Sequence, residues 1–251
     1  MKKLVLFLML LGSFIVVSDD HVKVMPGGEV GEFHYFDVMN PAAFVGAMDA
    51  FNVSDCAQKW HSESGAKVAL MSILGSGWTH FIYVGYEDLA KMEMGRNLLN
   101  CPAFFSMLVA LRESSNEEAY LSQVGPLSLQ LRDWTQDPYF MKFDLRVKPG
   151  SESEYAAAWT KYVEANSSVA KGSAGLVSML GGTGYSSHMA FVGGSSMAEI
   201  VSSLQEIQSS EAHAEFIGSV GDIRDIRNQM FVQPLKSVSY THLRAHETPA
   251  N

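Results

Sequence analysis

The sequence repeats itself. Four short blocks of the first half recur in the same order in the second half, each about 108 residues later. The pairs are Phe36-Asp37-Val38 with Phe143-Asp144-Leu145, Pro41 with Pro149, Ser72-Ile73-Leu74-Gly75 with Ser178-Met179-Leu180-Gly181, and the run from His80 with the run from His188. Repetition at a nearly constant spacing indicates a duplicated structural unit. Each copy is long enough to bury a core, and we expect the two copies to pack on each other.

The two ends of the chain are expected to lie outside the duplicated fold. Lys2 and Lys3 precede an apolar run that ends at Ser18, ahead of Asp19, which is the pattern of a secretory signal peptide. We predict a signal peptide at residues 1–18, a linker at 19–30, and export to a periplasm or the outside of the cell. Residues 237–251 lack an apolar period and are predicted to be a non-native or disordered tail.

Charge and cysteine content limit the classes of partner. The chain has 18 basic and 27 acidic residues, a formal net charge of −9. Such a surface repels phosphate backbones, so nucleic acid is not an expected partner, and membrane binding is not expected after signal cleavage. The only two cysteines, Cys56 and Cys101, are too few for a structural zinc site. In an exported chain they form either a disulfide or two separate buried thiols.

Each repeat is predicted to contain a strand, a helix, two strands, a helix and a strand. In the repeat at residues 31–135, an alternating strand at 33–39 precedes Pro41, which is typical of the first position of a helix. Glycines at 75 and 77 separate two β-type runs and predict a hairpin. The repeat at residues 136–236 has the same order, with strands predicted at 140–147, 176–180, 186–193 and 226–232.

This order is the βαββαβ ferredoxin-like motif, whose sheet has helices on only one face. The other face needs cover, and the second copy can supply it by packing sheet to sheet. The predicted fold is therefore α+β: two tandem ferredoxin-like units that form a barrel within one chain. In this pattern, residues 31–235 resemble the dimeric α/β-barrel superfamily, which includes antibiotic biosynthesis and haem-degrading monooxygenases. No motif of those families matches residue by residue, so none of their catalytic residues is transferred.

The candidate site is predicted to lie between the two sheets. If the more apolar face of each strand lies under the helices, then Asp37, His80, Asp144 and His188 point into a shared hollow. A carboxylate beside an imidazole fixes its tautomer and raises its basicity, so these four are the predicted acid and base residues. The alternative is that they are buried polar groups that satisfy one another. The residues predicted to contact a bound molecule are Tyr35, Trp78, Gln130, Arg132 and Arg146, with the two arginines holding an anionic group.

Three functions remain open from the sequence. The resemblance implies a monooxygenase-like enzyme that acts without a cofactor on a small, partly aromatic or oxygenated molecule. The second is a non-catalytic protein that binds a small ligand or an interaction partner in the same pocket. The third is a haem-binding protein with His80 or His188 as axial ligand, although the chain has no haem-attachment motif. No metal site is predicted, and assembly beyond the intrachain pseudo-dimer is left open.

Overall fold

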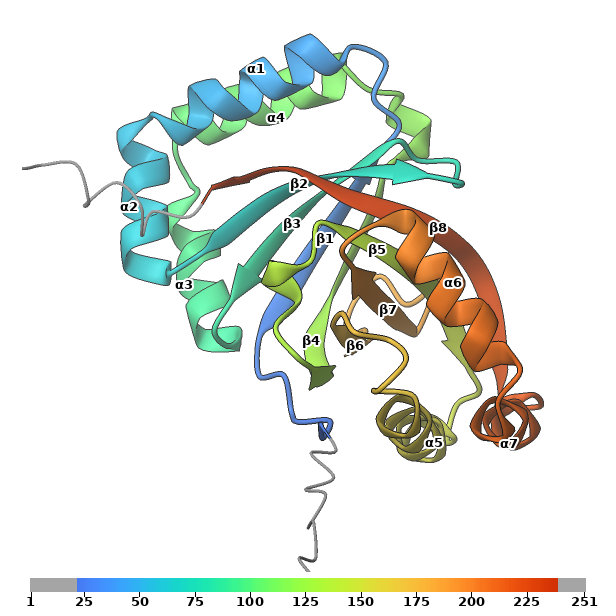
Figure 1. Cartoon of the computed structure of the whole chain (residues 1–251). Helices are drawn as coiled ribbons and strands as arrows, with labels where there is room; N and C mark the ends of the chain where they lie inside the picture. The colour runs from blue at the N-terminus through green and yellow to red at the C-terminus, as the bar shows by residue number, and fades with distance from the viewer. Residues whose placement is uncertain (1–21, 239–251) are drawn as a thin grey trace, which may run out of the picture.

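The computed structural model describes residues 22–238 and consists of one closed β-barrel with helices on two sides (Figure 1). The predicted signal peptide and all but the first two residues of the predicted tail lie outside the described residues. Eight antiparallel strands follow one another around the ring in the order β1-β3-β2-β8-β5-β7-β6-β4. The predicted α+β fold is therefore confirmed.

The first half of the chain forms four neighbouring strands and the helices outside them. Asn40 caps the first helix by accepting a hydrogen bond from the Ala43 amide (3.2 Å), and Pro41 occupies its first position, as predicted. Gly65, with φ of 70°, ends the second helix in the left-handed conformation. The elements are β1 (Val30–Phe36), α1 (Pro41–Asn52), α2 (Asp55–Ser64), β2 (Lys67–Leu74), β3 (His80–Tyr86), α3 (Leu89–Leu98), α4 (Pro102–Glu113), η1 (Glu117–Ala119) and β4 (Leu121–Leu131).

The second half repeats this arrangement on the opposite side of the barrel. Ser196 and Ser210 cap its last two helices by accepting backbone hydrogen bonds. Its last strand is longer than predicted because it pairs with β5 on one side and with β2 on the other. The elements are η2 (Trp134–Gln136), β5 (Tyr139–Val147), α5 (Glu152–Ala165), β6 (Ala174–Ser178), β7 (His188–Gly194), α6 (Met197–Gln208), α7 (Glu211–Val220) and β8 (Arg224–Val238).

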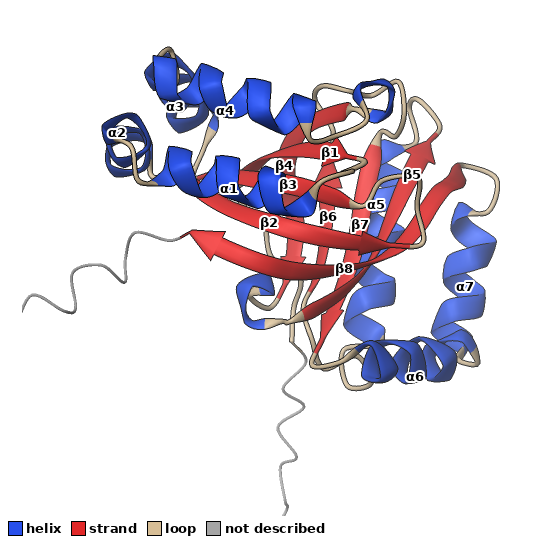
Figure 2. Cartoon of the chain, turned by 90° about the horizontal axis from the view of Figure 1, so that it is seen from above, coloured by secondary structure: helices blue, strands red, loops and turns tan. Residues whose placement is uncertain are grey.

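Two seams join the halves into a ring. Strands β2 and β8 pair along one seam, and β4 and β6 pair along the other. Helices α1 to α4 lie outside the strands of the first half, and α5 to α7 lie outside those of the second (Figure 2). The barrel therefore has one interior and two separate sheet–helix layers.

Each of these three regions has its own apolar core. The barrel interior is filled by aromatic and methionine side chains, including Phe33, Tyr35, Phe81 and Met189. An eight-stranded ring is just wide enough for side chains to fill it. A space of only about 70 Å³ remains beside Phe33 and Lys142. The prediction of a ligand-sized hollow between the sheets is therefore wrong. A ligand cavity must instead be sought between the outer face of the sheet and the helices.

The seam between β4 and β6 depends on close backbone approach at Gly125. A Cβ added there would lie 2.2 Å from the Ser178 carbonyl oxygen, which is backbone and cannot rotate away. We expect Gly125→Ala to destabilise the protein by about 1–3 kcal/mol in urea unfolding. Gly77→Ala is the control, because a Cβ at that position meets no atom within 4 Å. Equal midpoints for the two variants would contradict the tight seam.

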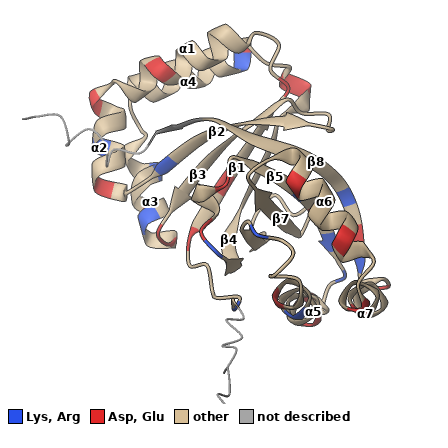
Figure 3. Ribbon diagram, in the orientation of Figure 1, with Lys and Arg blue, Asp and Glu red and all other residues tan. Residues whose placement is uncertain are grey.

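Charged residues are spread over the outside of the fold. In Figure 3 the acidic residues are distributed over the outer helices, including α1, α2 and α6, and do not gather at one place. None of the helices in the part of the chain that the structure describes is both long and apolar enough to cross a bilayer.

Candidate functional site

The two predicted catalytic histidines lie beneath the helices and not in the barrel. His80 faces Phe44 of α1, with 6.2 Å between ring centroids, and His188 faces Tyr155 of α5 at 5.9 Å. Burial lowers the pKa of both imidazoles. Their predicted orientation was wrong because a filled barrel has apolar side chains on both faces of each strand, so the more apolar face does not identify the helix side.

The duplication shows clearly at these histidines. The Nδ1 atom of His80 lies 2.9 Å from the Thr79 hydroxyl, and that of His188 lies 3.0 Å from the Ser187 hydroxyl. Each hydroxyl also accepts a backbone amide hydrogen bond, from Val38 (2.8 Å) and Val147 (2.9 Å) respectively. The Thr79 and Ser187 hydroxyls therefore link equivalent strand ends in the two halves, and each repeated histidine lies against one of them.

The two predicted carboxylates are not equivalent in the structure. Phe36 pairs with His80, whereas Leu145 pairs with His188, so the matched sequence blocks are offset by two residues. Asp37 consequently corresponds to Arg146 and not to Asp144. It follows the end of β1 and is half-buried, with its carbonyl accepting from the Asn116 amide (2.8 Å). The predicted pairing of Asp37 with His80 and of Asp144 with His188 was therefore wrong.

Asp144 does point into the barrel, as predicted, but its partner is Lys142. Both side chains are almost fully buried and form an ion pair. The Lys142 ammonium also lies 5.1 Å from the centroid of the Tyr35 ring. Burial lowers the pKa of Lys142, an effect that the Asp144 carboxylate opposes. Burial, with a further contribution from Asp144, raises the pKa of Tyr35 well above its usual value.

The other predicted contact residues support the fold. Tyr35 and Trp78 pack against each other at one end of the barrel interior, with 5.3 Å between ring centroids. The Gln130 side chain donates to the Arg132 carbonyl (2.6 Å). Arg132 donates to the carbonyls of Ser167, Ala170 and Gly172, and Arg146 donates to those of Thr183 and Gly184. Backbone carbonyls thus engage both Nη atoms of Arg132 and one Nη atom of Arg146, whereas Arg146 Nε has no partner among the described residues, so anion binding by the two arginines stays a prediction.

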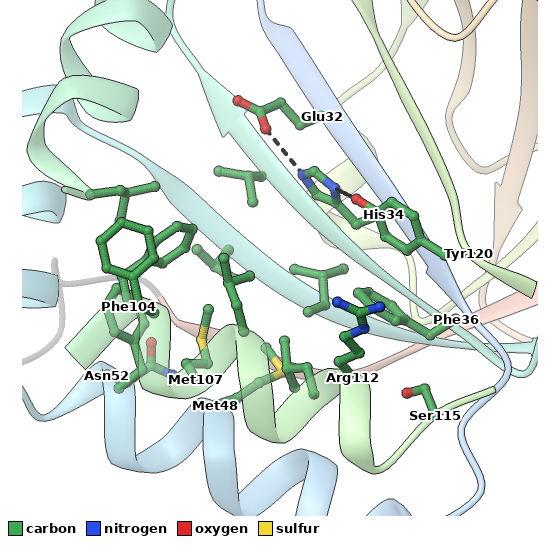
Figure 4. A pocket seen from close by; sticks show the side chains of 18 of the residues that line it. Glu32, His34, Phe36, Met48, Asn52, Phe104, Met107, Arg112, Ser115 and Tyr120 are labelled. Carbon is green, nitrogen blue, oxygen red and sulfur yellow. Dashed lines mark hydrogen bonds and ion pairs between the residues drawn. The ribbon is translucent and has the colours of Figure 1, made fainter. Parts of the chain in front are cut away.

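The candidate site is instead a cavity of about 680 Å³ in the first half, between the outer face of the sheet and helices α1 to α4. Figure 4 shows side chains from β1, from helices α1 and α4 and from the segment before β4 converging on it. Most of the lining is apolar. The apolar lining includes Phe36, Met48, Phe51, Ile82, Val84, Phe104, Met107 and Leu111.

A polar cluster forms one end of this cavity. Glu32 Oε2 lies 3.0 Å from His34 Nε2 and 2.6 Å from the Arg96 Nη1 atom. On the other side of the imidazole, His34 Nδ1 lies 2.8 Å from the Tyr120 hydroxyl. Glu32 is only 5% exposed although it carries a carboxylate. We call Glu32, His34, Arg96 and Tyr120 the polar cluster.

The charges of the polar cluster fix its hydrogen bonds. Burial alone would raise the pKa of Glu32, but its hydrogen bond to His34 and the nearby charges of His34 and Arg96 hold that pKa below its usual value. An ionised carboxylate only accepts, so His34 Nε2 must carry a proton that it donates to Glu32. In the neutral imidazole, Nδ1 then accepts from the Tyr120 hydroxyl.

The second half has a smaller counterpart of this cavity. A space of about 240 Å³ lies between its sheet and helices α5 to α7, lined by aromatic side chains that include Tyr155, Trp159 and Phe216. Tyr162 stacks on Phe216 there, with 4.4 Å between ring centroids. The two halves thus have the same arrangement of sheet and helices but differ in the volume of the cavity between them.

Sequence reasoning missed the polar cluster and the cavity around it. Alternation in β1 places His34 on the same face as Phe36, which was available from the sequence. Arg96 comes from α3 and Tyr120 from the end of η1, and no sequence pattern ties either residue to β1. Within residues 22–238, no group of three His, Cys, Asp or Glu side chains is placed to hold a metal ion.

The comparisons with known proteins agree with the barrel. No protein-family model matches the sequence, and no curated protein matches it significantly. Among solved structures, an anthrone oxidase-like protein superposes with a TM-score of 0.59 at 10% identity, over 86% of this chain and 96% of that chain. The chain has the dimeric α/β-barrel fold. This assignment rests on the closed ring of two ferredoxin-like halves and on that superposition.

Other solved structures share the dimeric α/β-barrel fold with similarly low sequence identity. A candidate monooxygenase from Fusobacterium nucleatum gives a TM-score of 0.55 at 15% identity, covering 86% of this chain and 96% of that one. A candidate chlorite dismutase gives 0.51 at 6% identity, covering 83% and 95%. Identities this low establish the dimeric α/β-barrel fold and leave the activity to be argued from the site.

Proposed function

We propose that this protein binds an apolar small molecule in the cavity of its first half. The observation that carries the proposal is a space of about 680 Å³ with mostly apolar walls and, at one end, a polar cluster around the buried Glu32 carboxylate. Ligand pockets for small molecules commonly measure 300–1,000 Å³ and combine apolar walls with a few placed polar groups. The barrel interior, at about 70 Å³, lacks that room.

Filling the cavity tests this proposal. Met107 lines the cavity from α4, whereas Val109 lies two residues further along the same helix and is 56% exposed. We expect Met107→Trp to weaken binding of the neutral fluorescent probe N-phenyl-1-naphthylamine by at least about tenfold, because the indole occupies the ligand's space. Val109→Trp is the matched control and should bind as the unaltered protein does. Equal affinities in two folded variants would place the ligand elsewhere.

Haem does not fit this cavity as a histidine-bound cofactor. Among the described residues that line it, His34 is the one histidine, and both of its ring nitrogens already have partners. Arg96 and Arg112, which would suit propionate groups, are paired with Glu32 and Glu117. His80 and His188, the axial ligands considered from the sequence, do not line either cavity. The residues therefore favour a ligand without an axial metal.

A second candidate function is a monooxygenase-like enzyme that acts in the same cavity. The oriented imidazole favours it: Glu32 holds the Nε2 proton of His34, so Nδ1 can accept a proton passed through the Tyr120 hydroxyl. Similar folds among candidate monooxygenases are consistent with this role. The two functions differ in product, since an enzyme converts the bound molecule in air and His34→Gln slows that conversion, whereas a binding protein releases it unchanged.

The proposed location is outside the cytoplasm. The structure joins Cys56 and Cys101 in a disulfide, with 6.6 Å between their Cα atoms. Disulfides persist in oxidising compartments, which supports the export proposed from the N-terminal sequence. Mass spectrometry of the mature protein, reading its first residue and the state of the two cysteines, tests both points.

A further inference from the structure

The lining of the cavity includes three buried polar atoms that have no hydrogen-bond partner among the described residues. One is Trp60 Nε1, and the two oxygen atoms are Glu32 Oε1 and the Ser115 hydroxyl. Glu32 and Ser115 are each 5% exposed. A buried polar atom without a partner is destabilising, so such atoms in a ligand cavity mark the groups that a ligand is suited to satisfy.

The two oxygen atoms lie at separate positions on the cavity wall. In Figure 4, Glu32 and Ser115 are separated by His34, Tyr120 and Phe36. Glu32 comes from β1, and Ser115 follows the end of α4. A single small group cannot reach both positions, which implies a ligand with polar groups at two ends of an apolar body.

The charge state of Glu32 decides which group it takes. Arg96 and His34 both donate to Oε2, which leaves Oε1 as a buried acceptor on an ionised carboxylate. An ionised carboxylate accepts and does not donate, so its ligand partner must be a hydroxyl or an amine N–H. An anionic ligand is disfavoured there, because the buried carboxylate repels it. At the other end, the Ser115 hydroxyl can donate or accept, and it suits a carbonyl or a second hydroxyl.

We propose that the ligand is an apolar molecule with a hydroxyl or amine donor at one end, bound by Glu32 Oε1, and a second polar group at the other, bound by Ser115. This inference rests on the proposed binding function and adds the chemical class of the ligand. It also distinguishes the roles of the two residues, since Glu32 selects for a donor and Ser115 adds affinity for a molecule long enough to reach it.

Matched biphenyls test the proposal by displacement of N-phenyl-1-naphthylamine. In the unaltered protein, 4-hydroxybiphenyl should compete about tenfold better than 4-methoxybiphenyl, because only the former donates to a charged acceptor. Glu32→Gln should reduce that ratio to about threefold or less. 4,4′-Dihydroxybiphenyl should exceed 4-hydroxybiphenyl in the unaltered protein, and Ser115→Ala should remove that gain. Glu118→Gln and Ser62→Ala, both exposed, are controls that should change neither ratio.

Each outcome has a separate meaning. If the probe binds but the hydroxyl and methoxy compounds compete equally, the donor requirement is overturned while the binding function stands. If the preferences persist in Glu32→Gln and Ser115→Ala, other groups make the contacts and the assignment of these two residues is overturned. If neither the probe nor any biphenyl binds, the proposed function itself fails.

Discussion

Lys142→Met should destabilise the protein by about 3–5 kcal/mol, because it leaves the Asp144 carboxylate buried without its counter-charge. Both side chains are almost fully shielded from water, at 3% and 1% exposure. The Tyr35 ring cannot replace the ammonium as a partner. Urea unfolding monitored by tryptophan fluorescence measures the loss as a lower midpoint.

Two further variants separate the ion pair from simple packing. The double variant Lys142→Met with Asp144→Leu should recover most of the lost stability, since apolar residues of similar volume often replace a buried ion pair without cost. Lys161→Met removes the exposed pair with Glu215, whose side chains are 69% and 58% exposed, and should cost less than about 1 kcal/mol. A single Lys142 variant as stable as the Lys161 variant would contradict the buried charge.

Loss of the Cys56–Cys101 disulfide should destabilise the protein by about 2–5 kcal/mol. The bond closes a segment with a sequence separation of 45 residues, so its removal releases much conformational freedom in the unfolded chain. It ties the start of α2 to the connection between α3 and α4, where Leu99 and Asn100 line the cavity. The measurement is urea unfolding of the variant Cys56→Ser with Cys101→Ser against the oxidised protein.

Reduction provides the control for the disulfide. A reductant should lower the unfolding midpoint of the unaltered protein to that of the double serine variant and should leave the variant unchanged. Because the bond holds part of the cavity wall, we also expect probe binding to weaken in the variant more than in Gly77→Ala, whose substitution lies in a turn away from that wall. Equal midpoints with and without reductant would show that the bond does not form.

The order of elements could be predicted from the sequence because its signals are local. Proline at the start of α1, the glycines between β2 and β3, and alternation within each strand depend on neighbouring residues only. The same signals in the second copy, 106 to 108 residues later, made the duplication and therefore the barrel predictable.

Local signals could not predict which side chains point into the barrel and which point toward the helices. Alternation shows which residues share a face, but it does not say which face lies inside a ring whose two surfaces are both apolar. Leu127 packs in the barrel interior, whereas Leu129 and Leu131 pack beneath the second-half helices, because the strand register shifts between Leu127 and Leu129. The two-residue offset between Asp37 and Asp144 has the same origin in strand pairing, which depends on distant parts of the chain.

Because the two halves belong to one chain, their sequences can change independently of each other. In a homodimer of identical chains, every substitution appears twice, so a change that enlarges one binding space enlarges both. Here the first half keeps about 680 Å³ beneath its helices while the second keeps about 240 Å³. In a tandem duplication, substitutions can enlarge the cavity of one repeat without changing the other repeat, which still completes the barrel. Selection can therefore act on each repeat separately.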